Sequence, residues 1–329
     1  MTATYGRNDN AHATPGSFRI PCRDGRLAGD RPRSARLSQQ ADPHRPRLRA
    51  GIQPRHHRPR DFAQPDEHPG QSVIVEPKPG AGERTAAQYL TTQPADGYTL
   101  YLITGGANVI SATDPQVTFS TLRDFSYIST ITLFPFALFV AANAPCKTLK
   151  DFMAAARERP GKLNYGHAGT GNTLHLAVEL LKARTGFQIE PVAYKDQGQL
   201  ISDVIVGRLD GSISTFTNFH SALNSGQARA LCVTSQERWP FNPDVRPVAE
   251  DVPGYEVVSW LGLAAPAGLP ADIATRLSKA VKIAVAVPEL QTRLRDVGNE
   301  ARASTPEQFR ARVVADYDKW KPLAKIVYP

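Results

Sequence analysis

The sequence predicts an α/β fold, and three observations support this prediction. The chain has 329 residues, of which 41% are hydrophobic, and that suffices for a large buried core. From Gln71 onward, short β-rich runs alternate with amphipathic stretches of helical length. Gly and Pro separate these runs, as they do at turns. No run reaches the roughly 20 uninterrupted apolar residues that a membrane-spanning helix needs.

The first half of this α/β region alternates strands and helices. Asp96-Gly97 predicts the turn before the second strand. Thr148 is expected to cap a helix, which the Pro160-Gly161 pair ends. We expect strands at 72–75, 98–104, 125–131 and 136–142, a loop at 77–82, and helices at 83–92 and 148–159.

The second half continues with a strand at 163–166 and a Gly-rich loop at 167–173. The helix after this loop has apolar residues at helical spacing, namely Leu174, Ala177, Val178 and Leu181. We expect strands at 189–194, 211–216 and 228–234, a proline-rich link at 239–253, a long strand or strand pair at 255–264, and helices at 271–286 and 305–320.

The first 70 residues have a different composition. They hold thirteen arginines, no lysine and seven acids, so most of the net charge of +8 lies here. They also hold nine of the 27 prolines, five of the eight histidines and no valine. So few aliphatic side chains cannot offset the entropy cost of ordering, and we expect residues 1–70 to be disordered. They contain no apolar stretch typical of a secretory signal.

The Gly-rich loop is the strongest chemical signal in the sequence. Glycines between a strand and a helix let backbone N–H groups converge on an anion at the helix N-terminus, which favours a carboxylate or a phosphate. The run 166–173 lacks the lysine of a Walker loop, and Leu174 stands where a dinucleotide motif needs its third glycine. A nucleotide-binding fold is therefore disfavoured. The alternative is a plain strand-to-helix turn.

A second loop of small residues, 104–108, also follows a predicted strand. In an open sheet, such a loop lies at the carboxyl ends of the strands, where ligands bind. Two loops of this kind predict a cleft, although a simple connector has the same composition.

Two alternative functions remain open at this point. His167 or His175 could serve an α/β enzyme, with Asp196 or Asp210 as the orienting carboxylate, but neither a serine elbow nor a metal-ligand spacing accompanies them. The arginine-rich run 45–60 could bind nucleic acid, but it contains neither aromatic residues nor lysine. The three cysteines, Cys22, Cys146 and Cys232, fit neither a metal site nor a disulfide framework.

An ordered set of motifs spans residues 71–329 and resembles the solute receptors of tripartite tricarboxylate transporters, the Bug-type periplasmic binding proteins. The motifs are Val75-Glu76 with Pro79-Gly80-Ala81-Gly82, Pro94 with Asp96-Gly97-Tyr98-Thr99-Leu100, Leu163-Asn164-Tyr165-Gly166, Ala168-Gly169 with Gly171, His175-Leu176, Tyr194-Lys195, Gly207 with Leu209-Asp210, Arg229-Ala230-Leu231 with Val233-Thr234-Ser235, Pro253-Gly254-Tyr255-Glu256, and Trp260 with Gly262-Leu263, Ala265-Pro266-Ala267-Gly268 and Pro270.

This resemblance implies a two-lobed α/β fold of the periplasmic-binding-protein (Venus-flytrap) type. Lobe 1 would comprise 71–133 and 254–329, lobe 2 would comprise 134–253, and the first lobe would be incomplete. The implied function is to bind a small carboxylate and deliver it to the transporter's membrane permease, without a cofactor, a metal or catalysis. The implied protein is a periplasmic monomer that does not bind nucleic acid, although the given chain shows no signal peptide.

The resemblance and the loops together define the candidate ligand-binding residues. Three departures from the family pattern place His167, Asp196 with Gln197, and Ser214 where the family has other residues, and an acid at Asp196 would repel a carboxylate. The candidates are Thr104, Gly105, Gly106, Asn108, His167, Ala168, Gly169, Thr170, Gly171, Asn172, Thr173, His175, Lys195, Asp196 and Ser214.

The family also opens with a strand and a Pro-Gly loop that residues 1–70 lack. Reading residues 52–60 one nucleotide later permits Phe-Ser-Pro-Gly-Thr-Thr-Asp-Leu-Val, a loop of that kind. We therefore hypothesise a frameshifted N-terminus, which would leave the chain without its first strand and part of its cleft. A binding-defective, truncated relic of the receptor is the corresponding alternative.

Overall fold

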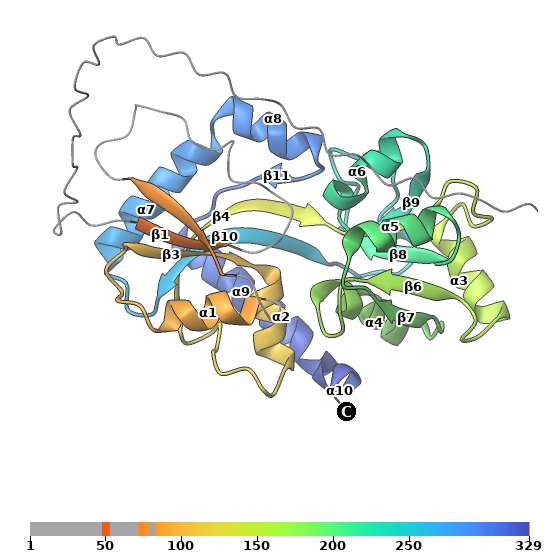
Figure 1. Ribbon diagram of the computed structural model, residues 1–329, viewed down its shortest axis with the longest axis horizontal. Coiled ribbons are helices and arrows are strands. Elements are labelled where there is room, and N and C mark those ends of the chain that lie inside the picture. Colours follow the sequence, from red (N-terminus) through yellow and green to blue (C-terminus); the bar gives the residue numbers. More distant parts are fainter. Residues whose placement is uncertain (1–47, 53–71, 79–82, 329) are drawn as a thin grey trace, which may run out of the picture. The chain divides into compact units, whose positions relative to one another are not determined.

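The computed structural model describes residues 48–52, 72–78 and 83–328, which form two β-sheets and their surrounding helices (Figure 1). The first sheet has six strands in the order β11-β4-β10-β3-β1-β2. β1, β2 and β3 are parallel, whereas β10 runs antiparallel to β3 and β4. The six strands of this first sheet are β1 Leu48–Ile52, β2 Val73–Pro77, β3 Thr99–Thr104, β4 Phe125–Pro135, β10 Val258–Pro266 and β11 Glu300–Ala301.

Strand β1 corrects part of the expectation for residues 1–70. The segment Leu48–Ile52 pairs with both β2 and β3, so the chain does have a first strand. The composition of the whole segment concealed a short run in which Leu48, Ala50 and Ile52 alternate with Arg49 and Gly51, the two-residue period of a strand. Backbone hydrogen bonds to two neighbours need no particular side chain. The rest of residues 1–70 lies outside the described residues.

The second sheet has five strands in the order β7-β6-β8-β5-β9. β6 is parallel to β7 and β8, and β5 is antiparallel to β8 and β9. The strands are β5 Ala137–Ala141, β6 Asn164–His167, β7 Glu190–Ala193, β8 Gly211–Ser214 and β9 Ala228–Val233. All of them lie within strand ranges expected from the sequence or within one residue of them.

The chain passes between the two sheets in two places. β4 ends at Pro135 and β5 begins at Ala137, so a single residue, Phe136, separates strands of different sheets. The return lies between Val233 of β9 and Val258 of β10. β4 and β10 lie side by side where the chain crosses (Figure 1). These crossings accord with the lobe boundaries expected from the resemblance, which remain a prediction.

The helices follow the expected pattern, with additions. Thr148 forms a full capping box with Asp151 at the start of α3, as predicted. The expected loop at 104–108 is instead the first turn of a helix, α2, and the sequence analysis also missed α5, α6, α8 and α10. The helices are α1 Arg84–Thr91, α2 Gly105–Thr113, α3 Leu149–Glu158, α4 Thr173–Thr185, α5 Gln197–Ile205, α6 Phe216–Asn224, α7 Ala271–Val285, α8 Pro288–Asp296, α9 Pro306–Trp320 and α10 Ala324–Val327, with 3-10 turns at Val248–Glu250 and Lys321–Leu323.

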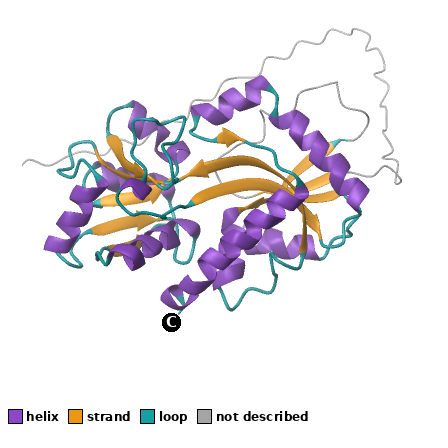
Figure 2. Cartoon of the chain, turned by 180° about the vertical axis from the view of Figure 1, so that it is seen from behind, coloured by secondary structure: helices purple, strands orange, loops and turns teal. Residues whose placement is uncertain are grey.

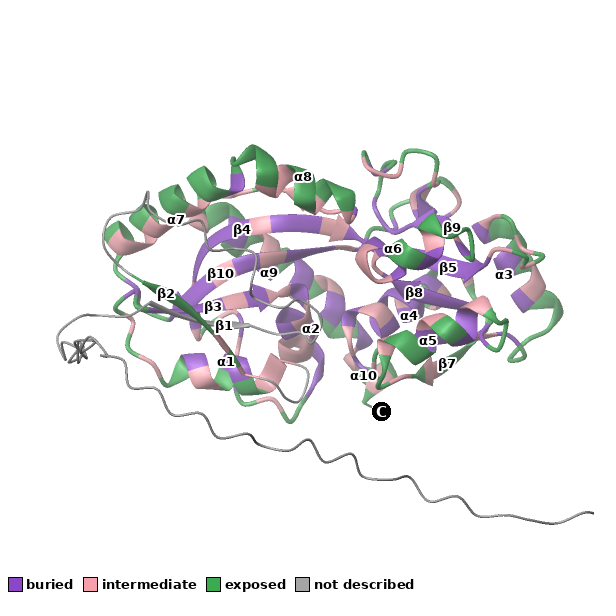
Figure 3. Cartoon of the chain, turned by 45° about the horizontal axis from the view of Figure 1, so that its top comes forward, coloured by how far each residue is buried: buried purple, intermediate pink, exposed green. Residues whose placement is uncertain are grey.

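Strands of each sheet contribute to two hydrophobic clusters. Trp260 and Phe309 belong to one cluster of the first sheet, with ring centroids 4.9 Å apart. Helices α7 and α9 both pack against β4, and Figure 2 shows helices on both faces of this sheet. Trp320 and Leu323, near the C-terminus, join the core of the second sheet. Figure 3 shows that the strands are mainly buried and that the outer sides of α7 and α8 are exposed.

Two further expectations concern the membrane and the cysteines. Among residues 48–52, 72–78 and 83–328, no helix is long and apolar enough to cross a membrane. Cys146 and Cys232 are both free thiols, and burial raises the pKa of Cys232 to about 12. Cys22 lies outside the described residues.

Candidate functional site

The strand registers place the carboxyl ends of the two sheets toward the same crossing point. In the first sheet, Thr104 at the end of β3 pairs with Leu261, near the start of β10. The first residue of β10, Val258, pairs with Pro135 at the end of β4. In the second sheet, Ser214 at the end of β8 pairs with Ala137, the first residue of β5. Since β6 and β7 run parallel to β8, they end at the same edge. The helix starts that follow these strands therefore face one another across the crossing (Figure 1).

The Gly-rich loop begins α4 at this edge. Gly169 and Gly171 have φ angles of 127° and 75°, values that L side chains rarely adopt. Asn172 caps the helix, and its side chain accepts a hydrogen bond from the His175 backbone N–H at 2.9 Å. The conformation of the loop therefore requires glycine at these two positions.

The loop's glycine N–H groups bind the protein's own histidines. Gly169 donates to Nδ1 of His167 at 3.2 Å, and Gly171 donates to Nδ1 of His175 at 3.1 Å. The two buried rings stack with their centroids 4.6 Å apart. This corrects the expectation that the glycine N–H groups point toward the ligand. Ala168 and Thr170, by contrast, are exposed at the tip of the loop.

Both imidazoles are held in the neutral form. Nδ1 must be unprotonated to accept a hydrogen bond from an N–H group. Burial lowers the pKa of His167 to about 4 and also lowers the pKa of His175. Glu179 lies behind the pair, with its Oε1 3.7 Å from His175 Nε2 and 2.8 Å from Lys182 Nζ.

This arrangement predicts a loss of stability in acid. The unfolded chain protonates both histidines near pH 6.5, whereas the folded chain binds a proton at His167 only near pH 4, so unfolding becomes easier as the pH falls through this window. The lowered pKa of His167 should contribute on the order of 2 to 3 kcal/mol to the free energy of unfolding at pH 7, and this contribution is lost in acid. Denaturant unfolding of the protein and of a His167→Gln variant at pH 7, 5.5 and 4 measures it. Equal losses in both proteins would contradict the assignment.

The carboxylates suggested as partners of a catalytic histidine lie elsewhere. Asp196 caps α5 and accepts a hydrogen bond from Gln199 N–H at 2.7 Å. Asp210 accepts one from Asn164 N–H at 2.9 Å, at the opposite end of β6. Neither orients a histidine. Capping also gives Asp196 a role that the sequence analysis missed, because it treated this residue as an orienting carboxylate or as an acid that would repel a carboxylate.

The start of α2 carries a carboxylate of its own. Thr104 caps this helix, and its Oγ1 accepts a hydrogen bond from Gly106 N–H at 2.9 Å. The Thr104 hydroxyl donates to Glu83 Oε1, and the Tyr101 hydroxyl donates to Glu83 Oε2 at 2.8 Å. Glu83 stands just before α1 with a φ of 78°. The sequence analysis missed it, although an acid directly after Gly82 was the available signal.

Three other candidates differ in their environment. Asn108 is fully buried, donates to Val313 O at 2.9 Å and accepts from the Thr121 hydroxyl at 2.6 Å, so both ends of its amide have partners within the protein. Lys195 is exposed at the end of β7. Ser214 is buried at the end of β8, and its Oγ accepts from Asn218 Nδ2 at 3.1 Å.

Contacts near the C-terminus connect the Gly-rich loop with the end of α2 and the start of α1. The Tyr328 hydroxyl donates to Asp114 at the end of α2 at 3.1 Å, and Arg84, next to Glu83, pairs with the same carboxylate. A Cβ atom on Gly171 would lie 2.9 Å from the Tyr328 hydroxyl oxygen. The Gly-rich loop and the α1–α2 region are therefore joined through Tyr328. No local pattern marked this residue, because its role depends on contacts between distant segments.

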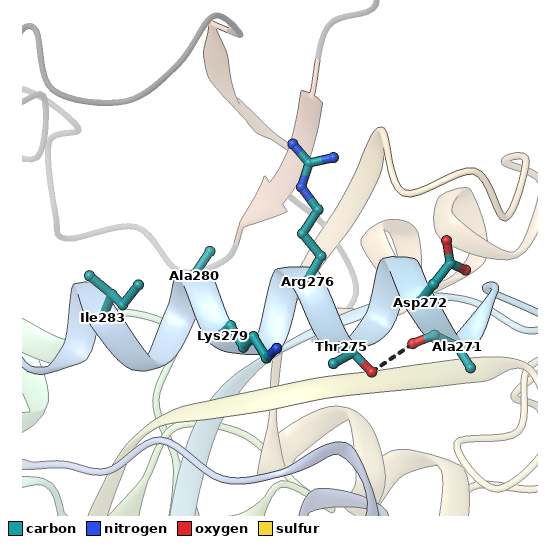
Figure 4. A pocket seen from close by; sticks show the side chains of 7 residues that line it. All are labelled: Ala271, Asp272, Thr275, Arg276, Lys279, Ala280 and Ile283. Atoms are coloured by element: carbon teal, nitrogen blue, oxygen red, sulfur yellow. Dashed lines mark hydrogen bonds between the residues drawn. The ribbon is translucent and has the colours of Figure 1, made fainter.

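A separate hollow lies along α7 (Figure 4). Its described lining comes from that helix alone and includes none of the candidate residues. Thr275 hydrogen-bonds to the helix's own Ala271 carbonyl at 2.8 Å. Polar groups from different elements do not converge here within the described part of the chain, so this hollow lacks the lining typical of a ligand site.

The fold and these helix starts define a solute-binding protein of the periplasmic class. The chain belongs to the tripartite tricarboxylate transporter family of receptors, whose family model matches residues 63–327. It is 32% identical over 256 residues to a protein encoded in the tcbD-tcbE intergenic region of Pseudomonas sp. (strain P51), covering 77% of this chain and 76% of that one.

Solved structures agree with this assignment. Rpa4515 of R. palustris with adipate is 31% identical, with a TM-score of 0.74 over 86% of this chain and 97% of that one. MatC (Rpa3494) from Rhodopseudomonas palustris with bound malate is 25% identical, with a TM-score of 0.70 over 86% of this chain and 100% of that one. The family resemblance and the periplasmic-binding-protein fold are thereby confirmed. The family is one of binding proteins and not of enzymes.

Proposed function

We propose that this protein is an extracytoplasmic receptor that binds a small carboxylate and delivers it to the permease of a tripartite tricarboxylate transporter. One observation carries the proposal. The carboxyl ends of β3, β6 and β8 all point toward the crossing between the sheets, and each leads into a helix with a polar N-cap, namely Thr104, Asn172 and Thr215. Helix N-termini that converge in this way favour an anion.

The exposed part of the Gly-rich loop supplies the contact on the second sheet. Thr170 projects from the tip, and the stacked histidines fix the backbone around it. His167 and His175 would therefore position the loop and would not touch the ligand. This refines the role expected for them from the sequence.

Relatives support the class of ligand. The solved structures of Rpa4515 and MatC hold adipate and malate, both of which are dicarboxylates. Delivery to a permease follows from membership of a transporter receptor family. A periplasmic location, where such a receptor meets its membrane partner, belongs to the same proposal.

A thermal-unfolding panel tests the proposal. Adipate, malate, citrate, benzoate and 6-aminohexanoate would be added to the full chain, with adipamide as the uncharged control. A carboxylate that binds the native state alone should raise the free energy of unfolding by about 2.7 kcal/mol at a hundredfold excess over its Kd. Adipamide should have no effect. A melting temperature that no carboxylate changes would contradict the proposed function.

A further inference from the structure

Glu83 holds a carboxylate at the helix start that the proposed function assigns to the ligand. Its Oε1 lies 3.0 Å from the position of a Cβ atom on Gly106, in the first turn of α2. The Thr104 hydroxyl donates a hydrogen bond to Glu83 Oε1, and the Tyr101 hydroxyl donates one to Glu83 Oε2. Two donors that a ligand carboxylate would need on this side are therefore already engaged.

The backbone at Glu83 is unusual as well. Among the described residues, Glu83 is the one non-glycine residue with a positive φ. A left-handed conformation is unfavourable at a residue other than glycine, asparagine or aspartate. The surrounding contacts hold the residue in this conformation and direct its carboxylate to α2.

The adjacent cation does not neutralise this carboxylate. Arg84 pairs with Asp114 at the other end of α2. The described part of the chain gives Glu83 hydroxyl and backbone donors but no ion pair. Burial raises the pKa of the Glu83 carboxyl group, whereas the hydrogen bonds from Thr104 and Tyr101 favour its charged form.

A second carboxylate at this position would be repelled. A helix N-terminus carries about half a positive charge, which cannot compensate two carboxylates at close range. A hydroxyl or ammonium group would instead find an acceptor already oriented there, and an ammonium would supply the missing counter-charge.

We propose that Glu83 determines ligand specificity: it excludes a second carboxylate from the start of α2 and accepts a hydrogen bond from a hydroxyl or ammonium group at the far end of a monocarboxylate. This inference rests on the proposed function, because the ligand's own carboxylate would lie at the opposite helix starts. It separates this chain from a receptor for simple dicarboxylates.

Ligands matched in length test the inference. Calorimetric titration of the full chain would compare succinate, 4-hydroxybutanoate and 4-aminobutanoate, and then adipate, 6-hydroxyhexanoate and 6-aminohexanoate. In at least one of the two length series, we expect the hydroxy acid or the amino acid to bind at least tenfold more tightly than the diacid of the same length. The Glu83→Gln variant should lose at least tenfold of this preference.

Two further variants keep the test decisive. Glu83→Gly removes the carboxylate and suits the positive φ, so it remains informative if Glu83→Gln folds poorly. Asp151→Asn removes a carboxylate from the start of α3, away from the site, and should leave the preference unchanged.

The outcomes separate the two proposals. The inference is overturned if the diacids bind the unaltered chain as tightly as the matched compounds, or if Glu83→Gln and Glu83→Gly keep its preference. It is also overturned, with the proposed function intact, if malate, citrate or benzoate binds but none of these six ligands does. If no carboxylate of either set binds any of the proteins, the proposed function itself fails.

Discussion

Replacing Trp260 by alanine should lower the free energy of unfolding by about 3 to 5 kcal/mol, the range for removing a large aromatic side chain from a core. Trp260 is fully buried, and its ring packs edge-on against Phe309 at 4.9 Å. Its Nε1–H donates to Asp316 Oδ2 at 2.8 Å, so the substitution also removes a donor from a buried carboxylate. Trp260 also lies behind Gly105, and its loss should loosen the start of α2.

Denaturant unfolding measures this effect, and Trp260→Phe is the matched control. Phenylalanine keeps most of the buried volume but removes the donor, so its cost should be smaller and should report mainly the hydrogen bond to Asp316. If Trp260→Ala lowered the free energy of unfolding by less than about 1 kcal/mol, the result would contradict the tight packing of Trp260 described above.

Replacing Gly171 by alanine should weaken carboxylate binding at least tenfold, whereas replacing Gly186 should not. The two glycines flank α4 and have nearly the same φ, 75° and 72°. The positive φ alone should cost each alanine variant about 1 to 2 kcal/mol of stability. Gly171→Ala should cost more than Gly186→Ala, because nothing lies within 4 Å of a Cβ atom on Gly186. Only Gly171 lies in the ligand loop, where a Cβ atom would also approach Tyr328.

Comparing Gly171→Ala with Gly186→Ala separates the effect of backbone strain on stability from the effect on ligand affinity. Unfolding measurements give the two stability costs, and calorimetric titration with the strongest carboxylate of the panel gives the two affinities. Equal affinities for the two variants would mean that the loop at 169–171 does not bind the ligand.

Most regular elements were predictable because their signals are local. Short β-rich or apolar runs predicted β3, β5 and β9, and Thr148 with Pro160-Gly161 predicted both ends of α3. The Gly-rich loop was predictable because its residues stand together in sequence. The ordered motifs predicted the family, since they span most of the chain.

Other features depend on contacts that no local pattern records. The small residues after Thr104 have the composition of a loop, but α9 packs against them and they form α2. The poor composition of residues 1–70 concealed β1, which two neighbouring strands stabilise. The direction of the glycine N–H groups could not be predicted, because it depends on the ring orientations of His167 and His175. Glu83 and Tyr328 join the site only through tertiary packing.

Amide hydrogen exchange with and without ligand tests the central claim most directly. The full chain would be measured alone and with the panel carboxylate that raises its melting temperature most. We predict slower exchange in two segments about 60 residues apart, 104–107 at the start of α2 and 168–174 at the start of α4, because one ligand contacts both. Unchanged exchange in both segments, or protection confined to the outer face of α7, would contradict the account.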